Sequence, residues 1–127
     1  MILIIGGMGA GKRSFAKEIL GYDPADIVWA TLDERPVLAG LHELLRAAPL
    51  SPPLLEALLQ KEALLCDEIG CGIVPMGKGE RAWRDEVGRA CAHLAREAET
   101  VVRICCGFPL LLKGSLEIDR PKNSTSI

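Results

Sequence analysis

The chain has 127 residues and a net charge of -2, with 49% hydrophobic and 25% charged residues. This length suits one domain that buries roughly two thirds of its unfolded surface, and the composition excludes a disordered or fibrous protein. The weak charge gives no electrostatic reason to expect a nucleic acid as partner. No apolar run approaches the ~20 residues of a membrane span and no secretory signal is recognisable, so we expect a cytoplasmic protein.

The first predicted elements are a strand, a glycine-rich loop and a helix. Residues 1–5 form a continuously apolar run, typical of a strand buried on both faces. The loop GGMGAGKRSF follows, and residues 12–20 then place apolar side chains on one helical stripe, with Gly21 as C-cap. We expect a second, short strand within residues 26–31.

The middle of the chain is predicted to be helical before it returns to a strand. Leucines at helical spacing predict a helix over residues 37–48. Ser51 as N-cap and a proline at the first helical position predict another over residues 52–59. The run EALLCDE is typical of a central strand, and it delivers Asp67 and Glu68 to its carboxyl end.

The last part of the chain holds the clearest helix. Glycines and a proline exclude a regular element over residues 69–79, whereas residues 80–98 carry one continuous apolar stripe. Residues 100–107 predict a strand and residues 108–113 a short edge strand. The tail, residues 114–127, is polar and expected to be loose.

Strands that alternate with helices predict an α/β fold, in which helices pack on a parallel or mostly parallel sheet. We expect one domain over residues 1–113. The five cysteines contain no C-x-x-C pair and are expected to be small buried hydrophobes. The apolar residues 73–75 pack either on another subunit or on the chain's own sheet, which leaves a homo-oligomer open.

The glycine-rich loop follows the phosphate-loop pattern G-x-x-x-x-G-K-[ST] through its lysine and then departs from it. In such a loop, backbone N–H groups hold phosphate oxygens and the lysine reaches the terminal phosphates. A glycine turn without a ligand is the alternative. The pattern favours nucleotide binding by Gly6, Gly7, Met8, Gly9, Ala10, Gly11, Lys12, Arg13 and Ser14.

Arg13 stands where the pattern requires a hydroxyl for Mg²⁺, and a guanidinium cannot ligate a cation. Ser14 could supply that hydroxyl only if the first helical turn shifts, because one residue is ~100° of helix rotation. Two interpretations of Arg13 stay open: it pairs with a phosphate, or it lies in solvent.

Other charged residues suggest roles beside the loop. Asp67 and Glu68 are expected to hold Mg²⁺ through water or to polarise an attacking group; the alternative is a pair of exposed carboxylates. Arg103 lies inside an apolar strand, so it must face a cleft, an edge or a partner acid. We expect His42 to be a half-buried packing residue and His93 to lie at the surface.

The later motifs resemble those of one family. DEIGCGIVP at residues 67–75, RDEVGR at 84–89 and CGFPLLLKG at 106–114 look like N-E-V-G-x-G-I-V-P, R-x-x-R-D-x-x-G and G-x-P-x-x-x-K, in the same order and at similar spacing, although N-E becomes Asp67-Glu68. With the loop, they resemble the bifunctional adenosylcobinamide kinase/adenosylcobinamide-phosphate guanylyltransferase of cobalamin biosynthesis. The similarity covers residues 1–20 and 64–114.

This resemblance implies a phosphate-loop NTPase-like fold of three layers and a transferase that uses GTP or ATP with Mg²⁺. Members of the family transfer a phosphoryl group to the aminopropanol hydroxyl of adenosylcobinamide, and then GMP from GTP through a guanylylated histidine. The resemblance implies that Gly6, Gly7, Gly11 and Lys12 bind phosphates, and that Glu68 lies at the nucleotide or the metal.

The chain also departs from the family. Its G-K-S becomes Gly11-Lys12-Arg13, and the stretch that holds the family's nucleophilic histidine is abbreviated, so that role does not transfer to His42. We therefore expect phosphoryl transfer, supported by Lys12, Mg²⁺ and Asp67 or Glu68, ahead of guanylyl transfer. Two alternatives stay open: a non-catalytic nucleotide- or partner-binding module, and a generic NTPase.

Overall fold

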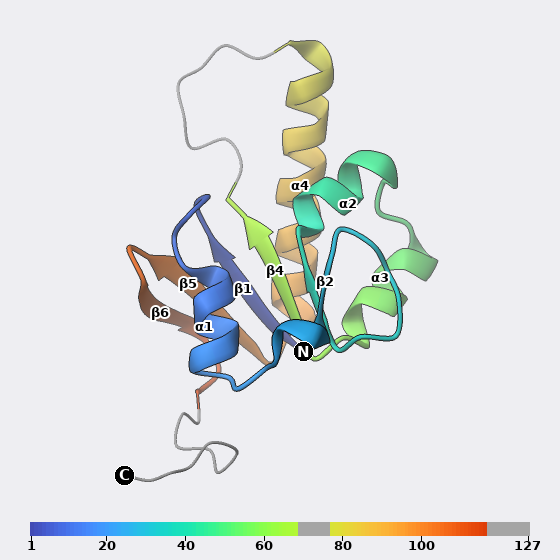
Figure 1. Ribbon diagram of the computed structural model, residues 1–127. Coiled ribbons are helices and arrows are strands. Elements are labelled where there is room, and N and C mark those ends of the chain that lie inside the picture. The colour runs from blue at the N-terminus through green and yellow to red at the C-terminus, as the bar shows by residue number, and fades with distance from the viewer. Residues whose placement is uncertain (69–76, 117–127) are drawn as a thin grey trace, which may run out of the picture.

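The computed structural model describes residues 1–68 and 77–116, and in this part it has one six-stranded sheet (Figure 1). The strand order is β2-β3-β4-β1-β5-β6. All neighbouring pairs are parallel except β5 with β6, which is antiparallel. The strands are Ile2–Gly6 (β1), Ile27–Trp29 (β2), Val37–Ala39 (β3), Ala63–Asp67 (β4), Thr100–Cys105 (β5) and Phe108–Lys113 (β6).

Helices cover both faces of the sheet, so the fold has three layers (Figure 1). One buried cluster joins the sheet to α2, α3 and α4, and a second joins its other face to α1. This arrangement confirms the predicted α/β fold of the phosphate-loop NTPase type with a mainly parallel sheet. The helices are Lys12–Glu18 (α1), Leu41–Ala47 (α2), Pro52–Leu59 (α3) and Lys78–Glu97 (α4), with a 3₁₀ turn at Pro24–Asp26.

Most of the expected elements are confirmed within a few residues. The helix α3 has the predicted bounds, and the Ser51 side chain accepts a hydrogen bond from the Leu54 N–H at its start. The helix α4 begins two residues earlier than expected, because Lys78 and Gly79 already belong to it. The rest of the glycine-rich stretch and most of the tail, residues 69–76 and 117–127, lie outside the described residues.

The prediction of one helix over residues 37–48 is wrong at its start. Val37–Ala39 forms the buried strand β3 between β2 and β4, and Gly40, with φ of 71°, turns the chain into α2. A strand of three buried residues shows no alternation, and the leucine spacing of the following helix continues backward across it. The extra strand places the N-terminal end of α2 beside the carboxyl ends of β3 and β4.

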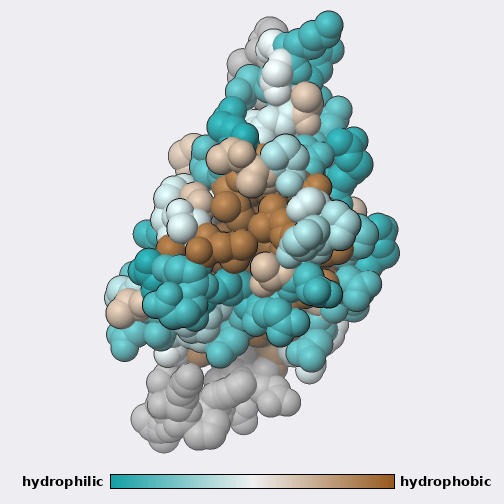
Figure 2. All heavy atoms as spheres, turned by 90° about the vertical axis from the view of Figure 1, so that its right-hand side faces the viewer, coloured by the Kyte–Doolittle hydropathy of each residue, from teal (hydrophilic) through white to brown (hydrophobic). Residues whose placement is uncertain are grey.

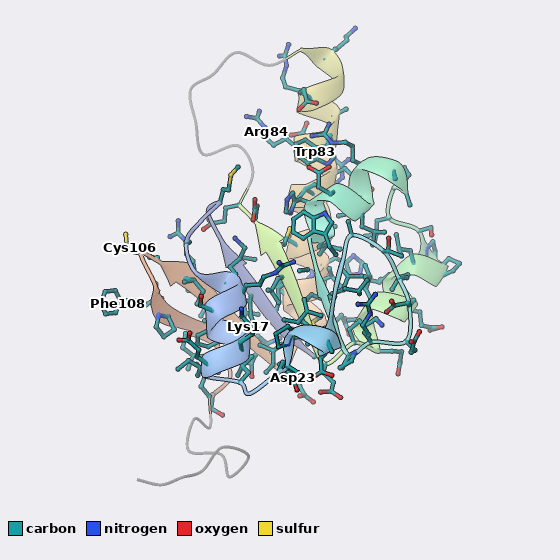
Figure 3. All side chains as sticks on the ribbon, viewed as in Figure 1. Lys17, Asp23, Trp83, Arg84, Cys106 and Phe108 are labelled. Carbon is teal, nitrogen blue, oxygen red and sulfur yellow. The ribbon has the colours of Figure 1, made fainter. Side chains whose placement is uncertain are left out.

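Two surfaces of the molecule are apolar. Figure 2 shows brown side chains gathered in the middle of the face that carries α3, and half-buried leucines such as Leu54, Leu55 and Leu59 pack there against the core. The edge strand β6 is exposed along its whole length, and Phe108 at its start points away from the sheet (Figure 3). Among the described residues, no helix is both long and apolar enough to cross a membrane.

Candidate functional site

The strand β1 runs directly into the glycine-rich loop. At three positions of this loop, the backbone conformation or a close neighbour requires a glycine. Gly9 and Gly11 have φ of 75° and 104°, which L side chains rarely adopt. At Gly6, an added Cβ would lie 2.7 Å from the carbonyl oxygen of Ile104 in β5. The loop therefore depends on glycine both for its own turns and for its close approach to the neighbouring strand.

The turn between β5 and β6 supports this loop from the side. Cys106 and Gly107 both have positive φ, 50° and 80°, as a tight hairpin turn requires. The N–H of Gly107 donates a hydrogen bond to the carbonyl oxygen of Ala10 at 2.9 Å. Sequence reasoning missed this support, because it placed Cys106 and Gly107 at the end of a predicted strand, whereas β5 ends at Cys105.

Lys12 is folded back over the loop. Its Nζ donates to the carbonyl oxygens of Gly6 and Gly7 at 3.1 and 2.9 Å and lies 2.7 Å from Asp67 Oδ1. The side chains of Lys12 and Asp67 are only 11% and 19% exposed. The structure thus brings together the lysine of the loop and one carboxylate at the end of β4, as the sequence predicts.

His42 holds Asp67 from the other side. The backbone N–H of Asp67 donates to His42 Nδ1 at 3.2 Å, and His42 Nε2 lies 3.4 Å from Asp67 Oδ2. Because Nδ1 accepts, the ring proton of the neutral form lies on Nε2 and faces the carboxylate. Burial lowers the pKa of His42, against the opposing effect of Asp67. His42 is buried more deeply than expected, and both its nitrogens face Asp67.

Glu68 points to the opposite face of the sheet. Its N–H bonds to the carbonyl oxygen of Gly6, so strand geometry continues through it. Its carboxylate accepts a hydrogen bond from Arg103 Nε at 2.8 Å, on the face where Cys66 packs toward α4. The expectation that Arg103 faces a cleft, an edge or an acid is confirmed. The role of Glu68 at the nucleotide or metal stays a prediction.

A pocket of about 420 Å³ opens between the loop and the carboxyl ends of β2 and β4. Its size lies within the range of small-molecule sites, roughly 300–1,000 Å³. It collects seven of the predicted site residues together with Trp29, Gly40 and Leu65, which sequence reasoning missed. The lining residues are Met8, Gly9, Gly11, Lys12, Arg13, Ser14, Trp29, Gly40, Leu65 and Asp67.

Arg13 lies at this pocket, with its guanidinium carbon 5.6 Å from the centroid of the Trp29 ring. Arg13 is exposed to solvent, as one of the two interpretations of this residue expects, and it also contacts an aromatic ring. Pairing with a phosphate stays a prediction. Trp29 lies within residues 26–31, where a strand was expected, and an aromatic residue at the end of that strand could have indicated a place in the pocket.

The donor atoms of the pocket fit Mg²⁺. Asp67 supplies a carboxylate and Ser14 a hydroxyl, and Mg²⁺ commonly takes only one or two carboxylates beside phosphate oxygens and water. Within residues 1–68 and 77–116, no three or more His, Cys, Asp or Glu side chains form a group that could hold a metal without such a partner. These donors therefore suit an ion that arrives with a nucleotide.

The cysteines follow the expectation only in part. Cys66 is buried in the core, and its Sγ lies 3.6 Å from that of half-buried Cys91. The contact with Cys91 and burial raise the pKa of Cys66. Cys105 and Cys106 are exposed at the hairpin, so the prediction of burial is wrong for both, because an antiparallel edge strand leaves its turn uncovered.

The sheet order, the glycine-rich loop and its lysine define the class: an α/β protein with the phosphate-loop NTPase fold. Residues 53–112 match the family model described as "Cobinamide kinase / cobinamide phosphate guanyltransferase". This match confirms the resemblance over these residues. The matched segment runs from α3 to β6 and includes Asp67 and Glu68 but not the loop. The curated proteins hold no match to the chain.

The match supports a cobinamide kinase/guanyltransferase-like function, with nucleotides and cobinamide as the general classes of substrate that this family suggests. It connects the chain with cobalamin biosynthesis.

Proposed function

We propose that the chain transfers a phosphoryl group from GTP or ATP to the aminopropanol hydroxyl of adenosylcobinamide. One observation carries this proposal: Lys12 and Asp67 meet at 2.7 Å in a pocket bounded by the glycine-rich loop. A lysine cation and a carboxylate at the end of a neighbouring strand are the groups that phosphoryl transfer uses for charge stabilisation and positioning.

The geometry suggests how these residues act. Backbone N–H groups of the loop hold phosphate oxygens, and Lys12 leaves Asp67 to reach the terminal phosphates. Ser14 and Asp67 would hold Mg²⁺, which neutralises charge on the transferred group. The acceptor hydroxyl oxygen bonds to the γ-phosphorus as the bond to the bridging oxygen breaks. Asp67, which lines the pocket, would hold Mg²⁺ or accept the hydroxyl proton.

The surroundings of His42 favour phosphoryl transfer over guanylyl transfer. A histidine that accepts GMP needs a nitrogen lone pair free to attack phosphorus. The Nδ1 lone pair of His42 accepts the Asp67 N–H, and Nε2 carries the proton that faces the carboxylate. His93 is exposed on α4, away from the pocket lining.

The test compares two lysines of α1. The purified chain is incubated with Mg²⁺, adenosylcobinamide and ATP or GTP, and the corrinoid products are read by mass spectrometry. Lys12→Ala should lower phosphorylation about 100-fold or more, because it removes a preorganised charge from the transferred phosphate. Lys17→Ala should leave it unchanged, since Lys17 is exposed outside the pocket (Figure 3).

Arg13 favours a second candidate, a non-catalytic nucleotide-binding module. It replaces the hydroxyl that normally ligates the metal, and its guanidinium lies toward Trp29. This candidate predicts that the chain binds nucleotide while the corrinoid stays unchanged. Phosphorylated corrinoid that depends on Lys12 would exclude it, whereas a GMP adduct would contradict both candidates.

A further inference from the structure

Trp29 is an exposed aromatic residue inside the candidate nucleotide pocket. It ends β2, its side chain is 53% exposed, and it lines the same pocket as Lys12 and Gly9. Large aromatic side chains normally bury most of their surface, so an exposed one in a concave site suits contact with a ligand. The mechanism of phosphoryl transfer leaves this residue unused.

Neighbouring residues hold the Trp29 ring in place. A Cβ added to Gly40 would lie 2.8–2.9 Å from Cδ2, Cε2 and Cε3, so one face of the ring lies against the Gly40 backbone. The His42 ring meets it edge-on, at 5.8 Å between centroids and 84° between planes. The ring is thus fixed by two residues that belong to the β3–α2 junction, and ordering it on binding costs little side-chain entropy.

The contact of Trp29 with Arg13 is looser than the comparable pair elsewhere in the chain. Arg46 stacks on Trp83 with its guanidinium carbon 3.7 Å from the ring centroid, and it is also held by Glu80. Arg13 lies at 5.6 Å from the Trp29 centroid, on an exposed side chain. Because Arg13 is not packed tightly on the ring, a small movement of its flexible side chain can admit a planar group.

We propose that Trp29 is the stacking surface for the purine base of the nucleotide whose phosphates the glycine-rich loop holds. This inference rests on the proposed function. One continuous pocket of about 420 Å³ joins Trp29 to the loop, so a single ligand can reach both. Such a ligand carries phosphates at one end and a flat, π-rich group at the other, which describes a purine nucleotide.

The first experiment separates base binding from phosphate binding. The affinities of GTP, ATP and inorganic tripolyphosphate, each with Mg²⁺, are measured by calorimetry for the unaltered chain, Trp29→Ala and Trp29→Phe. Trp29→Ala should weaken nucleotide binding roughly 5- to 150-fold, the range for loss of base–aromatic stacking, while tripolyphosphate binding stays constant. Trp29→Phe keeps a smaller aromatic face, so its affinity for nucleotides should lie between those of the unaltered chain and Trp29→Ala.

The second experiment observes the ring itself. The chain has two tryptophans, so Trp83→Phe leaves Trp29 as the single indole fluorophore. In this background a purine nucleotide should quench the emission as the base stacks, and tripolyphosphate should not. Adenosylcobinamide alone is the third probe, because its flat ring system is another planar group. Quenching by this probe, with none by nucleotides, would assign Trp29 to the acceptor and overturn the inference.

The outcomes distinguish a failure of the stacking role from a failure of the proposed function. If Trp29→Ala weakens tripolyphosphate as much as nucleotides, or weakens neither, the nucleotide site stands and the stacking role is wrong. If the unaltered, folded chain binds neither nucleotide nor tripolyphosphate, the proposed function fails and the stacking role fails with it. Thermal unfolding of each variant, followed by circular dichroism, shows whether a loss of binding reflects a loss of folding.

Discussion

Asp67 and Glu68 are consecutive carboxylates at the end of one strand, yet they occupy different environments. Asp67 lies in the pocket on the α1 side of the sheet, 2.7 Å from Lys12 and beside His42. Glu68 lies on the α4 side, paired with Arg103, whose side chain is 42% exposed. The alternation of a β-strand therefore assigns one carboxylate to the candidate site and the other to an ion pair outside the pocket lining.

This difference means that two carboxylates at the same strand end have different surroundings. The face of the sheet also matters, because only one face carries the loop and the pocket. Three predictions test whether the two carboxylates differ in function as they do in surroundings.

The largest expected difference concerns phosphoryl transfer. Asp67→Asn should lower the phosphorylation of adenosylcobinamide about 100-fold or more, since it removes the pocket carboxylate that we propose to hold the ion or the proton. Glu68→Gln should stay within about threefold of the unaltered chain, because an exposed or half-exposed ion pair contributes little. Equal losses in the two variants, measured by single-turnover mass spectrometry, would remove the distinction between the two faces.

A smaller effect is expected when the metal is removed. In EDTA, a phosphate that enters the pocket must separate Lys12 from Asp67 and then meet the carboxylate charge. Asp67→Asn should therefore bind tripolyphosphate about fivefold more tightly than the unaltered chain. Glu68→Gln should show no change. Weaker binding by Asp67→Asn in the same calorimetric titration would mean that Asp67 does not compete with the phosphate for Lys12.

The smallest effect concerns pH. Burial lowers the folded-state pKa of His42 below its ordinary value of 6.5, so the neutral ring stabilises the fold above that pH. This contribution is lost as the pH falls from 6.5 toward the folded pKa, where a proton on Nδ1 would oppose the Asp67 N–H. Among the described residues, the ion-pair partner of Glu68 is Arg103, and a guanidinium keeps its charge over this pH range.

His42→Asn retains an acceptor for the Asp67 N–H and removes the titration. Its melting temperature should fall less between about pH 7 and about pH 5 than that of the unaltered chain. His93→Asn, at an exposed position on α4, is the matched control and should keep the full slope. A slope that is the same in both variants would assign the pH dependence to other groups.

Local pattern was sufficient for much of the fold. Continuous apolar runs marked β1, β4 and β5, and capping residues marked α3. The strand β3 could not be recognised, because three buried residues carry no period and the helical leucines of α2 follow directly. The strand β3 can be recognised only from its pairing with β2 and β4 on either side.

The loop and the Asp67 carboxylate of the candidate site could be predicted from the sequence, but the other residues that line the pocket could not. Lys12 belongs to the phosphate-loop pattern, and Asp67 directly follows an apolar run that is typical of a central strand. Trp29, His42 and Gly107 become part of the site only because strand pairing brings residues distant in sequence to one edge of the sheet. The period-two rule could have separated Asp67 from Glu68 in the sequence itself.

The hydrogen bond from Gly107 to Ala10 has a consequence for the order in which the chain is made. The ribosome releases the glycine-rich loop early, but β1 pairs with β4 and β5, which are synthesised later. Until residue 107 has emerged, Ala10 has no partner in the hairpin turn and Gly6 has no neighbouring Ile104. A nascent chain therefore cannot form this hydrogen bond to the loop before the hairpin exists.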